Sequence, residues 1–345
     1  MKRYNLAVIG VGAVGREILR CLRQRNFPLG NLKVFARTSR DIQVDKEVFK
    51  VEVITPESFQ DIDIALFAGT EGEKGAGLQW AEAAVNSGAV VIDNGADFRL
   101  REDVPLIVPE VNREKISEHK GIIANPNCTT IQMVVSLSQI YKRFGLEQII
   151  LTSFQAVSGA GRTACKVLWE ETKRIVEENK DLDYLSINKK IKGYQPEVFP
   201  SQIAFNVICQ IGSFKEDDFT TEEIKTVKET HKIFNDNSIK ITSTCVRVPV
   251  FTSHSEAIYF RTKKKVSLEE IKKALKESEG VVYEEDPQKF FSPVDCEGKD
   301  AVFVSRLRKD PFNENSFWVW SVSDNLRKGA ALNAVQIAEN LIPLL

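Results

Sequence analysis

A cysteine at the predicted start of a helix is the strongest candidate for chemistry in this sequence. Cys128 follows Asn125-Pro126-Asn127 and opens an apolar run, Thr129 to Phe144, that has helical spacing. The positive end of a helix dipole stabilises a thiolate, so this position is expected to lower the pKa of Cys128 and to favour a nucleophile. The other cysteines receive no catalytic role, and three of them are expected to be buried structural residues: Cys21, Cys165 and Cys209.

A thiolate that attacks an aldehyde needs an acid or base nearby, and His254 is the best candidate among the three histidines. It follows a strand-like run, Ile239 to Val250, in which Arg247 alternates with valines. A guanidinium at this position suits a carboxylate in fork geometry. The residues alone leave open that His254 is a polar loop residue and Arg247 a surface charge.

A glycine motif near the N-terminus predicts a nucleotide site. Gly10-Val11-Gly12-Ala13-Val14-Gly15 follows a short strand, Leu6 to Ile9, and begins a segment in which Ile18, Leu19 and Leu22 recur at helical spacing. In this context the glycines let a pyrophosphate approach backbone N–H groups at a helix N-terminus. The alternative is a tight turn that only packs helix on strand.

The end of the second predicted strand favours NADP over NAD. Phe35-Ala36-Arg37-Thr38-Ser39-Arg40 stands where an NAD enzyme usually places an acid for the ribose 2′-hydroxyl. Two guanidinium groups and two hydroxyls suit a 2′-phosphate, which an acid would repel. A solvated basic loop is the alternative.

The order of elements predicts an α/β protein with two domains. Strands at Leu32–Ala36, Ile62–Phe67 and Val90–Asp93 alternate with helical stretches such as Leu78–Asn86, which is typical of a Rossmann-type doubly wound parallel sheet. Beyond Ile149, β-rich runs mix with helices, which indicates a second α+β domain, and its catalytic and dimerisation role is implied only by the family resemblance of its motifs. We place the NADP-binding domain at 1–127, completed by a C-terminal helix at 326–345, and the second domain at 128–325.

Composition narrows the range of partners. With 47 basic and 48 acidic residues the net charge is −1, so no long-range field favours nucleic acid or an anionic membrane. We find no signal peptide, no membrane span and no cysteine or histidine spacing suited to a metal or a disulfide framework, and we expect a cytoplasmic enzyme. The charged stretch 170–192 lacks a sustained apolar stripe and is given no chemistry.

Several motifs resemble those of aspartate-semialdehyde dehydrogenases. The likeness extends over nearly the whole chain, which makes chance agreement implausible. The motifs are Val108-Pro109-Glu110-Val111-Asn112, Asn125-Pro126-Asn127-Cys128-Thr129-Thr130-Ile131-Gln132, Gln155-Ala156-Val157-Ser158-Gly159-Ala160-Gly161, Arg247-Val248-Pro249-Val250 with His254-Ser255-Glu256, and Ser323-Asp324-Asn325-Leu326-Arg327-Lys328-Gly329-Ala330-Ala331.

The resemblance implies a covalent mechanism with Cys128 as the nucleophile. It implies that Gln155 helps to orient the reacting group and that His254 is the acid/base residue. In this mechanism the thiolate adds to the aldehyde, hydride passes to NADP, and inorganic phosphate cleaves the acyl-enzyme. The substrate would be L-aspartate 4-semialdehyde and the product L-aspartyl 4-phosphate, in lysine, threonine and methionine biosynthesis.

The resemblance also implies the substrate contacts and the assembly. Arg247 would bind the substrate carboxylate and Glu222 its ammonium group, whereas spacing alone favours a surface ion pair between Glu222 and Lys225. A homodimer is expected. Inorganic phosphate would bind to Lys225 and Arg99, and Asn127 would line the substrate site and the phosphate site. Further expected cofactor contacts are Gly69, Thr70, Ser158, Gly159 and Asn325.

Two departures from the family pattern weigh on these assignments. The glycine loop is one residue shorter than usual and lacks a customary threonine. Asp97-Phe98-Arg99-Leu100 resembles a motif of N-acetyl-gamma-glutamyl-phosphate reductases, which share the thioester chemistry and are the second hypothesis. A Cys-His hydrolase would use the same two side chains but would not need the glycine motif. A non-catalytic NADP-binding relative would not need to keep Cys128 and His254.

Overall fold

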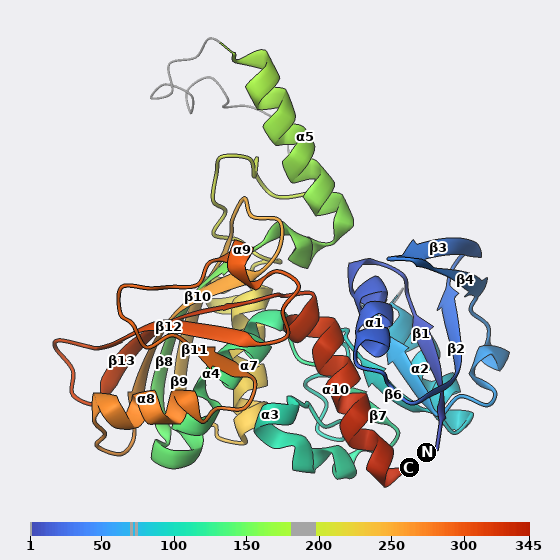
Figure 1. Ribbon diagram of the computed structural model, residues 1–345, viewed down its shortest axis with the longest axis horizontal. Coiled ribbons are helices and arrows are strands. Elements are labelled where there is room, and N and C mark those ends of the chain that lie inside the picture. The colour runs from blue at the N-terminus through green and yellow to red at the C-terminus, as the bar shows by residue number, and fades with distance from the viewer. Residues whose placement is uncertain (1, 70–71, 73–74, 181–197) are drawn as a thin grey trace.

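Two β-sheets, one from each half of the chain, organise the structure (Figure 1). The computed structural model describes residues 2–69, 72, 75–180 and 198–345, so the predicted cofactor contact Thr70 lies outside the described residues. The first sheet has seven strands in the order β3-β4-β2-β1-β5-β6-β7. These are β1 (Tyr4–Ile9), β2 (Leu29–Ala36), β3 (Arg40–Val44), β4 (Glu47–Val53), β5 (Ile64–Phe67), β6 (Val90–Asp93) and β7 (Ile122–Ala124).

Strand β1 lies in the middle of the first sheet and packs against helices on both faces. Leu6 and Val8 share a core with α1 (Ala13–Gln24) and α10 (Leu332–Leu341). Ala7 and Ile9 belong to the core that contains α2 (Ala76–Asn86). Buried on both sides, the strand reads as a nearly continuous apolar run, which is the predicted doubly wound α/β arrangement.

A hairpin at the edge of this sheet was not predicted. β3 and β4 pair antiparallel around Asp45, which has a φ of 53°, and β4 then pairs parallel with β2. Only short alternating runs mark the two strands, and Asp45-Lys46 is a weaker hairpin signal than Asn-Gly. The hairpin extends the sheet beyond the loop Arg37–Arg40.

The second sheet is mixed and positions the reactive residues at its strand ends. Its order is β11-β12-β13-β10-β8-β9, with β8 and β9 parallel and β10 antiparallel to β8 and β13. The bounds are β8 (Leu146–Gln155), β9 (Lys240–Arg247), β10 (His254–Thr262), β11 (Val281–Tyr283), β12 (Val302–Lys309) and β13 (Ser316–Ser323).

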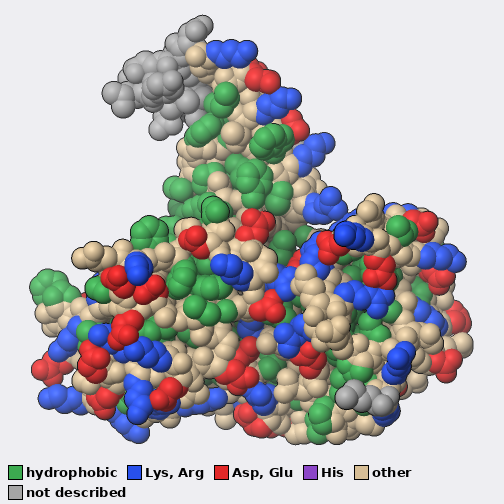
Figure 2. Space-filling model, in the orientation of Figure 1, with side chains coloured by type: hydrophobic (Ala, Val, Ile, Leu, Met, Phe, Trp, Pro, Cys, Tyr) green, Lys and Arg blue, Asp and Glu red, His purple; other side chains and the backbone are tan. Residues whose placement is uncertain are grey.

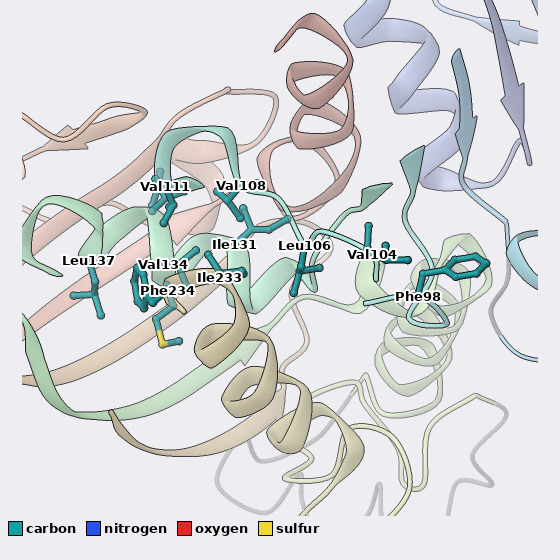
Figure 3. Packing of buried hydrophobic residues seen from close by; sticks show 14 of the residues in the cluster. Phe98, Val104, Leu106, Val108, Val111, Ile131, Val134, Leu137, Ile233 and Phe234 are labelled. Carbon is teal, nitrogen blue, oxygen red and sulfur yellow. The ribbon is translucent and has the colours of Figure 1, made fainter. Parts of the chain in front are cut away.

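Helices α4 (Cys128–Phe144), α7 (Thr221–Phe234) and α8 (Leu268–Lys276) pack beside this sheet. Figure 3 shows the apolar contacts below the N-terminus of α4, where Ile131 and Val134 face Ile233 and Phe234 of α7. Dense packing of this kind fixes the two helices relative to each other. The remaining helical segments are η1 (Pro56–Phe59), α3 (Pro109–Asn112), η2 (Arg113–Glu118), η3 (Val157–Ala160), η5 (Glu216–Asp218), α9 (Pro293–Cys296), η6 (Arg327–Ala331) and η7 (Ile342–Leu344).

Helix α5 (Arg162–Glu178) projects from the body of the molecule (Figure 1). Leu168, Glu171 and Ile175 are buried along one side of it. Within the described part of the charged stretch 170–192, Ile175 is the buried apolar residue of this helix, so the expectation that the stretch lacks a sustained apolar stripe is not contradicted. Residues 181–197 of that stretch lie outside the described residues.

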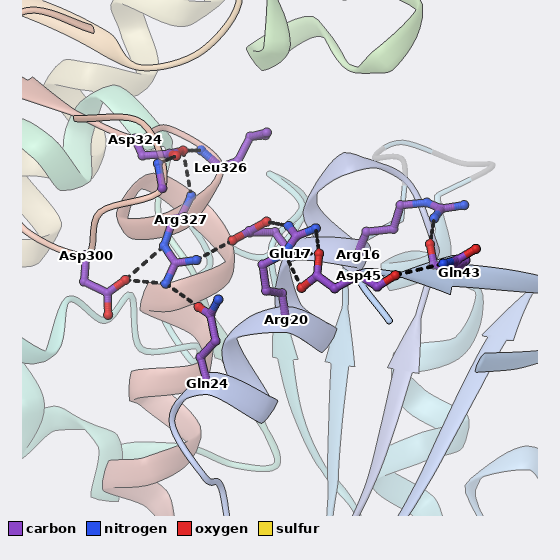
Figure 4. Close-up of polar contacts among 11 residues, drawn as sticks. Arg16, Glu17, Arg20, Gln24, Gln43, Asp45, Asp300, Asp324, Leu326 and Arg327 are labelled. Atoms are coloured by element: carbon purple, nitrogen blue, oxygen red, sulfur yellow. Dashed lines mark hydrogen bonds and ion pairs between the residues drawn. The ribbon is translucent and has the colours of Figure 1, made fainter. Parts of the chain in front are cut away.

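Arg327, the first residue of the π-helix η6, forms hydrogen bonds with helix α1 of the first half of the chain and with Asp300 of the second half (Figure 4). Its guanidinium donates to Glu17 Oε1 of α1 at 2.8 Å, to Gln24 Oε1 at 2.9 Å and to Asp300 Oδ1 at 2.9 Å. Short π-helical segments often mark functional sites. Here the segment connects β13 to α10.

Other expectations concern membranes, metals and cysteines. None of the helices in the described ranges has both the length and the apolar character to cross a membrane. The same residues contain no cluster of His, Cys, Asp and Glu suited to a metal ion. Cys21 is buried and Cys165 is half-buried, but Cys209 is exposed, so the expectation of a buried Cys209 is wrong.

Candidate active site

Cys128 is the first residue of α4, with Asn127 as the N-cap. The side-chain oxygen of Asn127 accepts hydrogen bonds from the backbone N–H groups of Thr129 at 3.0 Å and Thr130 at 3.2 Å. An asparagine in this role satisfies donors that the first helical turn leaves unpaired. The cap fixes the start of α4 and with it the direction of the Cys128 side chain.

His254 stands opposite the thiol. Its Nε2 lies 3.3 Å from Cys128 Sγ, and its Nδ1 accepts the backbone N–H of Ala156 at 3.1 Å. The side chain is fully buried, and burial lowers the pKa of His254 well below its usual value, with a further contribution from the Arg247 charge. Since Nδ1 is an acceptor, the proton of the neutral ring resides on Nε2.

The expectation of a lowered pKa for Cys128 is wrong for this structure. Burial raises the pKa of its thiol to about 12, and the carboxylate of Glu222 adds to the rise. Arg247, Arg99 and the Thr129 N–H act in the opposite direction. The loss of hydration raises the pKa of Cys128 more than the N–H group at the helix end lowers it, because burial disfavours the charged form of a thiol.

Charged groups from separate elements converge around the thiol. Glu222, buried near the start of α7, accepts from Asn127 Nδ2 at 2.8 Å and from Gln155 Nε2 at 3.4 Å. Arg247 at the end of β9 is buried and donates to the Ala156 carbonyl at 2.7 Å, and burial lowers its pKa. The surface ion pair favoured by helical spacing is therefore wrong for Glu222.

A cavity of about 580 Å³ opens over these groups, and Cys128 contributes to its wall. His254 is not among the lining residues, although its Nε2 contacts the thiol that is. Most of the predicted substrate, catalytic and nearby cofactor residues share the lining: Val14, Gly69, Arg99, Asn127, Cys128, Gln155, Ser158, Gly159, Glu222, Lys225, Arg247 and Asn325.

Asn325 and the π-helix contact this cavity from the opposite side. Asn325 Oδ1 accepts from Ser158 Oγ at 3.1 Å and from the backbone N–H of Ser253 at 2.9 Å. Gly329 follows in the π-helix, where a Cβ would lie 2.9 Å from Cys128 Cβ. Only a glycine lets this segment approach the thiol so closely.

A second cavity of about 480 Å³ lies at the carboxyl end of β1. Gly10, Gly12, Arg37, Thr38 and Arg40 line it, and Gly69 lines both cavities, so the two meet at that residue. Sequence reasoning missed five further lining residues, for which it had no motif: Ile54, Ala68, Ala76, Gln79 and Trp80.

The remaining residues of the predicted cofactor set line neither cavity. Gly15 has a packing role, because a Cβ there would lie 1.9 Å from the Gly10 carbonyl oxygen. This contact brings α1 close to the end of β1, as the third glycine of such motifs does. Ala13 begins α1, and Ser39 lies in the loop before β3.

Comparison with known proteins places both halves of the chain in one family. The family model "Semialdehyde dehydrogenase, NAD binding domain" matches residues 5–119, and "Semialdehyde dehydrogenase, dimerisation domain" matches residues 137–328. Aspartate-semialdehyde dehydrogenases of Aquifex aeolicus and Bacillus subtilis are each 44% identical to this chain, over 98% of it and over 98% and 97% of their own lengths.

A solved structure agrees over the same range. Aspartate semialdehyde dehydrogenase II from Vibrio cholerae, complexed with ASA, superposes with a TM-score of 0.92 at 39% identity and covers 99% of both chains. The family expected from the sequence motifs is confirmed. The chain belongs to the aspartate-semialdehyde dehydrogenases, which are oxidoreductases, and has their fold of a nucleotide-binding domain and a dimerisation domain.

Proposed function

We propose that this chain catalyses the reversible, phosphorylating oxidation of L-aspartate 4-semialdehyde to L-aspartyl 4-phosphate with NADP. The observation that carries the proposal is the 3.3 Å contact between Cys128 Sγ and His254 Nε2, at a thiol that lines the same cavity as the Arg247 guanidinium and the Glu222 carboxylate. The membership of the chain in the same family as the relatives named above also supports the proposal. The reaction would serve lysine, threonine and methionine biosynthesis.

The charges around the thiol suit a zwitterionic substrate. Arg247 would bind the substrate carboxylate in fork geometry, while Glu222 would bind its ammonium group. Lys225 and Arg99 line the same cavity and would bind inorganic phosphate near the positive end of α4. An N-acetylated substrate has no ammonium group for Glu222, so the alternative of an N-acetyl-gamma-glutamyl-phosphate reductase fits less well.

In the oxidative direction the Cys128 thiol would first lose its proton to solvent, and the thiolate would then add to the aldehyde carbon while the carbonyl electron pair moves to oxygen. Gln155, buried beside Glu222, would help to orient that oxygen, and His254 Nε2–H would donate to it. When bound, NADP would accept the hydride that leaves this carbon as the thioester forms. A phosphate oxygen would then attack the thioester carbon, the C–S bond would break, and the thiolate would be restored.

The second cavity fits a cofactor with a 2′-phosphate. Arg37, Thr38 and Arg40 line it, and Arg40 Nη1 donates to Thr38 Oγ1 at 2.6 Å. Guanidinium groups would bind a phosphate there. We expect an Arg37→Asp variant to lose most of its kcat/KM with NADP and to gain with NAD, because the new carboxylate repels the phosphate and accepts from a ribose hydroxyl.

We also propose that the chain forms a cytoplasmic homodimer through its second domain. Phe154 and Trp320 are in contact on the half-buried face of the second sheet, with their ring planes tilted by 44°, and Trp169 and Val176 of α5 are 58% and 55% exposed. Figure 2 shows apolar side chains gathered along α5. Light scattering should give a dimer mass, and Trp169→Glu should shift it toward the monomer, because the interface would bury a carboxylate.

An absorbance assay of NADPH formation tests the activity. The purified protein is given aspartate 4-semialdehyde, phosphate and NADP, beside Cys128→Ala and beside a parallel assay with N-acetylglutamate 5-semialdehyde. We expect phosphate-dependent turnover of the first substrate that is lost in the variant. Turnover of the acetylated substrate alone would select the reductase instead, and turnover of neither would indicate a non-catalytic relative.

A further inference from the structure

A carboxylate outside the cavity holds two parts of its wall. Glu229 on α7 is 1% exposed and is not among the residues that line the cavity. Its Oε1 accepts from Arg99 Nη1 at 3.1 Å, and its Oε2 accepts from the backbone N–H of Asn127 at 2.6 Å. Both oxygens of one buried side chain are therefore bonded to groups that lie at the reaction site.

The Arg99 guanidinium is held at three of its corners. Besides the Glu229 contact, Nε donates to the Asn125 carbonyl at 2.9 Å and Nη2 donates to the Asn94 carbonyl at 2.8 Å. A planar guanidinium held in this way has a fixed orientation rather than a set of rotamers. Its position in the cavity wall is thus set by Glu229 together with two backbone carbonyls.

The second contact of Glu229 acts on the N-terminus of α4. The bonded N–H belongs to Asn127, whose side chain caps the helix and donates to Glu222. Cys128 is the next residue. Holding the cap fixes the helix end, and with it the positive dipole end that favours a bound anion.

Stability alone is a weak explanation for this arrangement. A buried ion pair loses about as much hydration energy as it gains in attraction, and apolar replacements are often as stable. Burial raises the pKa of Glu229, while Arg99 and the Asn127 N–H favour its charged form. The contacts instead give Arg99 and the helix end one defined relative geometry.

We propose that Glu229 is a positioning residue for the oxyanion co-substrate, acting through Arg99 and the N-terminus of α4. This inference rests on the proposed function, because it assigns inorganic phosphate to the corner formed by Arg99 and α4. Within the described residues Glu229 makes no hydrogen bond to Arg247 or Glu222, which carry the recognition of the aldehyde, and it reaches Glu222 only through Asn127. Its loss should therefore impair the use of phosphate more than the binding of the aldehyde.

Steady-state kinetics of Glu229→Gln tests the proposal. The amide keeps the shape of the side chain but places an N–H against one of the two donors. Loss of a charge-assisted hydrogen bond of this kind corresponds to a change of about tenfold or more in a binding or rate constant. We expect kcat/KM for phosphate to fall by that factor and KM for aspartate 4-semialdehyde to change less than about twofold. A fall of both by the same factor would overturn the proposal.

A double-mutant cycle separates positioning from general damage. Because Glu229 acts partly through Arg99, Glu229→Gln should cause a smaller loss in the Arg99→Ala background than in the wild type, whereas independent losses multiply. Glu171→Gln is the matched control. Glu171 is also a buried glutamate that accepts two backbone N–H groups, from Ile203 at 2.9 Å and Ala204 at 3.0 Å, and its replacement should leave both kinetic constants unchanged.

A binding measurement keeps this proposal separate from the proposed reaction. Iodoacetamide alkylation of Cys128 is followed by mass spectrometry with increasing inorganic phosphate. We expect phosphate to slow alkylation, and Glu229→Gln to raise the half-effective concentration about tenfold or more. Protection that depends on Glu229 without any turnover would reject the reaction but keep the inference, while normal protection in the variant would overturn the inference. If Glu229→Gln does not fold, Glu229→Asp is subjected to the same measurements with the same expectations.

Discussion

The backbone N–H of Ala156 donates to Nδ1 of His254, with 3.1 Å between the two nitrogens. This contact fixes the neutral ring with its proton on Nε2, which faces Cys128. A ring protonated on both nitrogens would turn a second N–H toward that of Ala156, so the contact disfavours the charged form. Burial and the charge of Arg247 lower the pKa of His254 in the same direction.

We therefore expect His254 to act as a hydrogen-bond donor to the reacting oxygen, rather than as the base that sequence resemblance implied. A glutamine at this position can accept from Ala156 with its oxygen and donate with its nitrogen, but it cannot remove a proton. His254→Gln should keep kcat within about tenfold of the wild type, whereas His254→Ala should lose about 10²- to 10³-fold, as other enzymes do without one oxyanion donor. Stopped-flow measurement of the hydride step compares the three proteins.

Nitrogen-15 shifts of the imidazole rings provide the control, since only three histidines are present. The Nε2–H form should persist in His254 throughout the range in which the protein stays folded. Equal losses in the glutamine and alanine variants would instead restore the role of a base.

The thiol of Cys128 should react slowly with a neutral alkylating reagent, because burial raises its pKa to about 12. The rate with iodoacetamide should rise about tenfold per pH unit up to pH 10 without a plateau, as the thiolate fraction does. Glu222→Gln removes the negative charge that raises this pKa, so its alkylation should be faster at every pH. Glu171→Gln, which does not touch the site, should match the wild type. A rate in Glu222→Gln that is equal to or below the wild-type rate contradicts this electrostatic assignment.

The glycine of the π-helix should be indispensable for turnover. In Gly329→Ala the new Cβ would lie 2.9 Å from Cys128 Cβ and 3.4 Å from its Cα, and neither atom can move without shifting the start of α4. Such overpacking typically destabilises a protein by about 1–3 kcal/mol. We expect a lower midpoint of thermal unfolding. We also expect kcat to fall by more than the decrease in the folded fraction of the protein explains. Full activity in a folded variant would show that the segment can yield.

Local patterns in the sequence predicted the elements that carry the chemistry. The strand, the glycine turn and the helix from Leu6 to Leu22 are each defined by neighbouring residues, and Cys128 precedes a helix-compatible run with recurring apolar residues. Those signals do not depend on the rest of the chain. The helix that begins at Cys128 was therefore predicted to within one residue.

Features that depend on tertiary contacts were not predicted. Helical spacing alone made Glu222 part of a surface ion pair, only the family resemblance placed it at the substrate, and Glu229 was given no role. The packing of α7 beside α4 buries both. The rise in the pKa of Cys128 has the same origin, because its sign depends on how much water the folded chain excludes. Helical spacing contains no information about the burial of a charged face, so Glu229 was overlooked.

A buried glutamate with no bonded partner should make stability depend on pH. Glu256 on β10 is fully buried, and both of its carboxyl oxygens lack a hydrogen bond within the described residues. Burial raises the pKa of Glu256 well above its usual value, so the acid stays protonated to a higher pH in the folded state than in the unfolded chain. Unfolding releases that proton above about pH 4.5, and the wild type therefore loses about 1.4 kcal/mol of stability per pH unit up to the folded pKa.

Glu256→Gln should not show this loss, because an amide has the same shape but does not titrate. Urea unfolding at pH 5, 6, 7 and 8, at one protein concentration, gives the difference in free energy between the two proteins at each pH. The nearby Cys245, with a pKa raised to about 12, does not titrate in this range and is present in both. The free energy of unfolding of the variant should be nearly equal to that of the wild type at pH 5 and should exceed it increasingly as the pH rises. A difference that stays constant would mean that Glu256 is already ionised in the folded protein, and would require a partner for it outside the described residues.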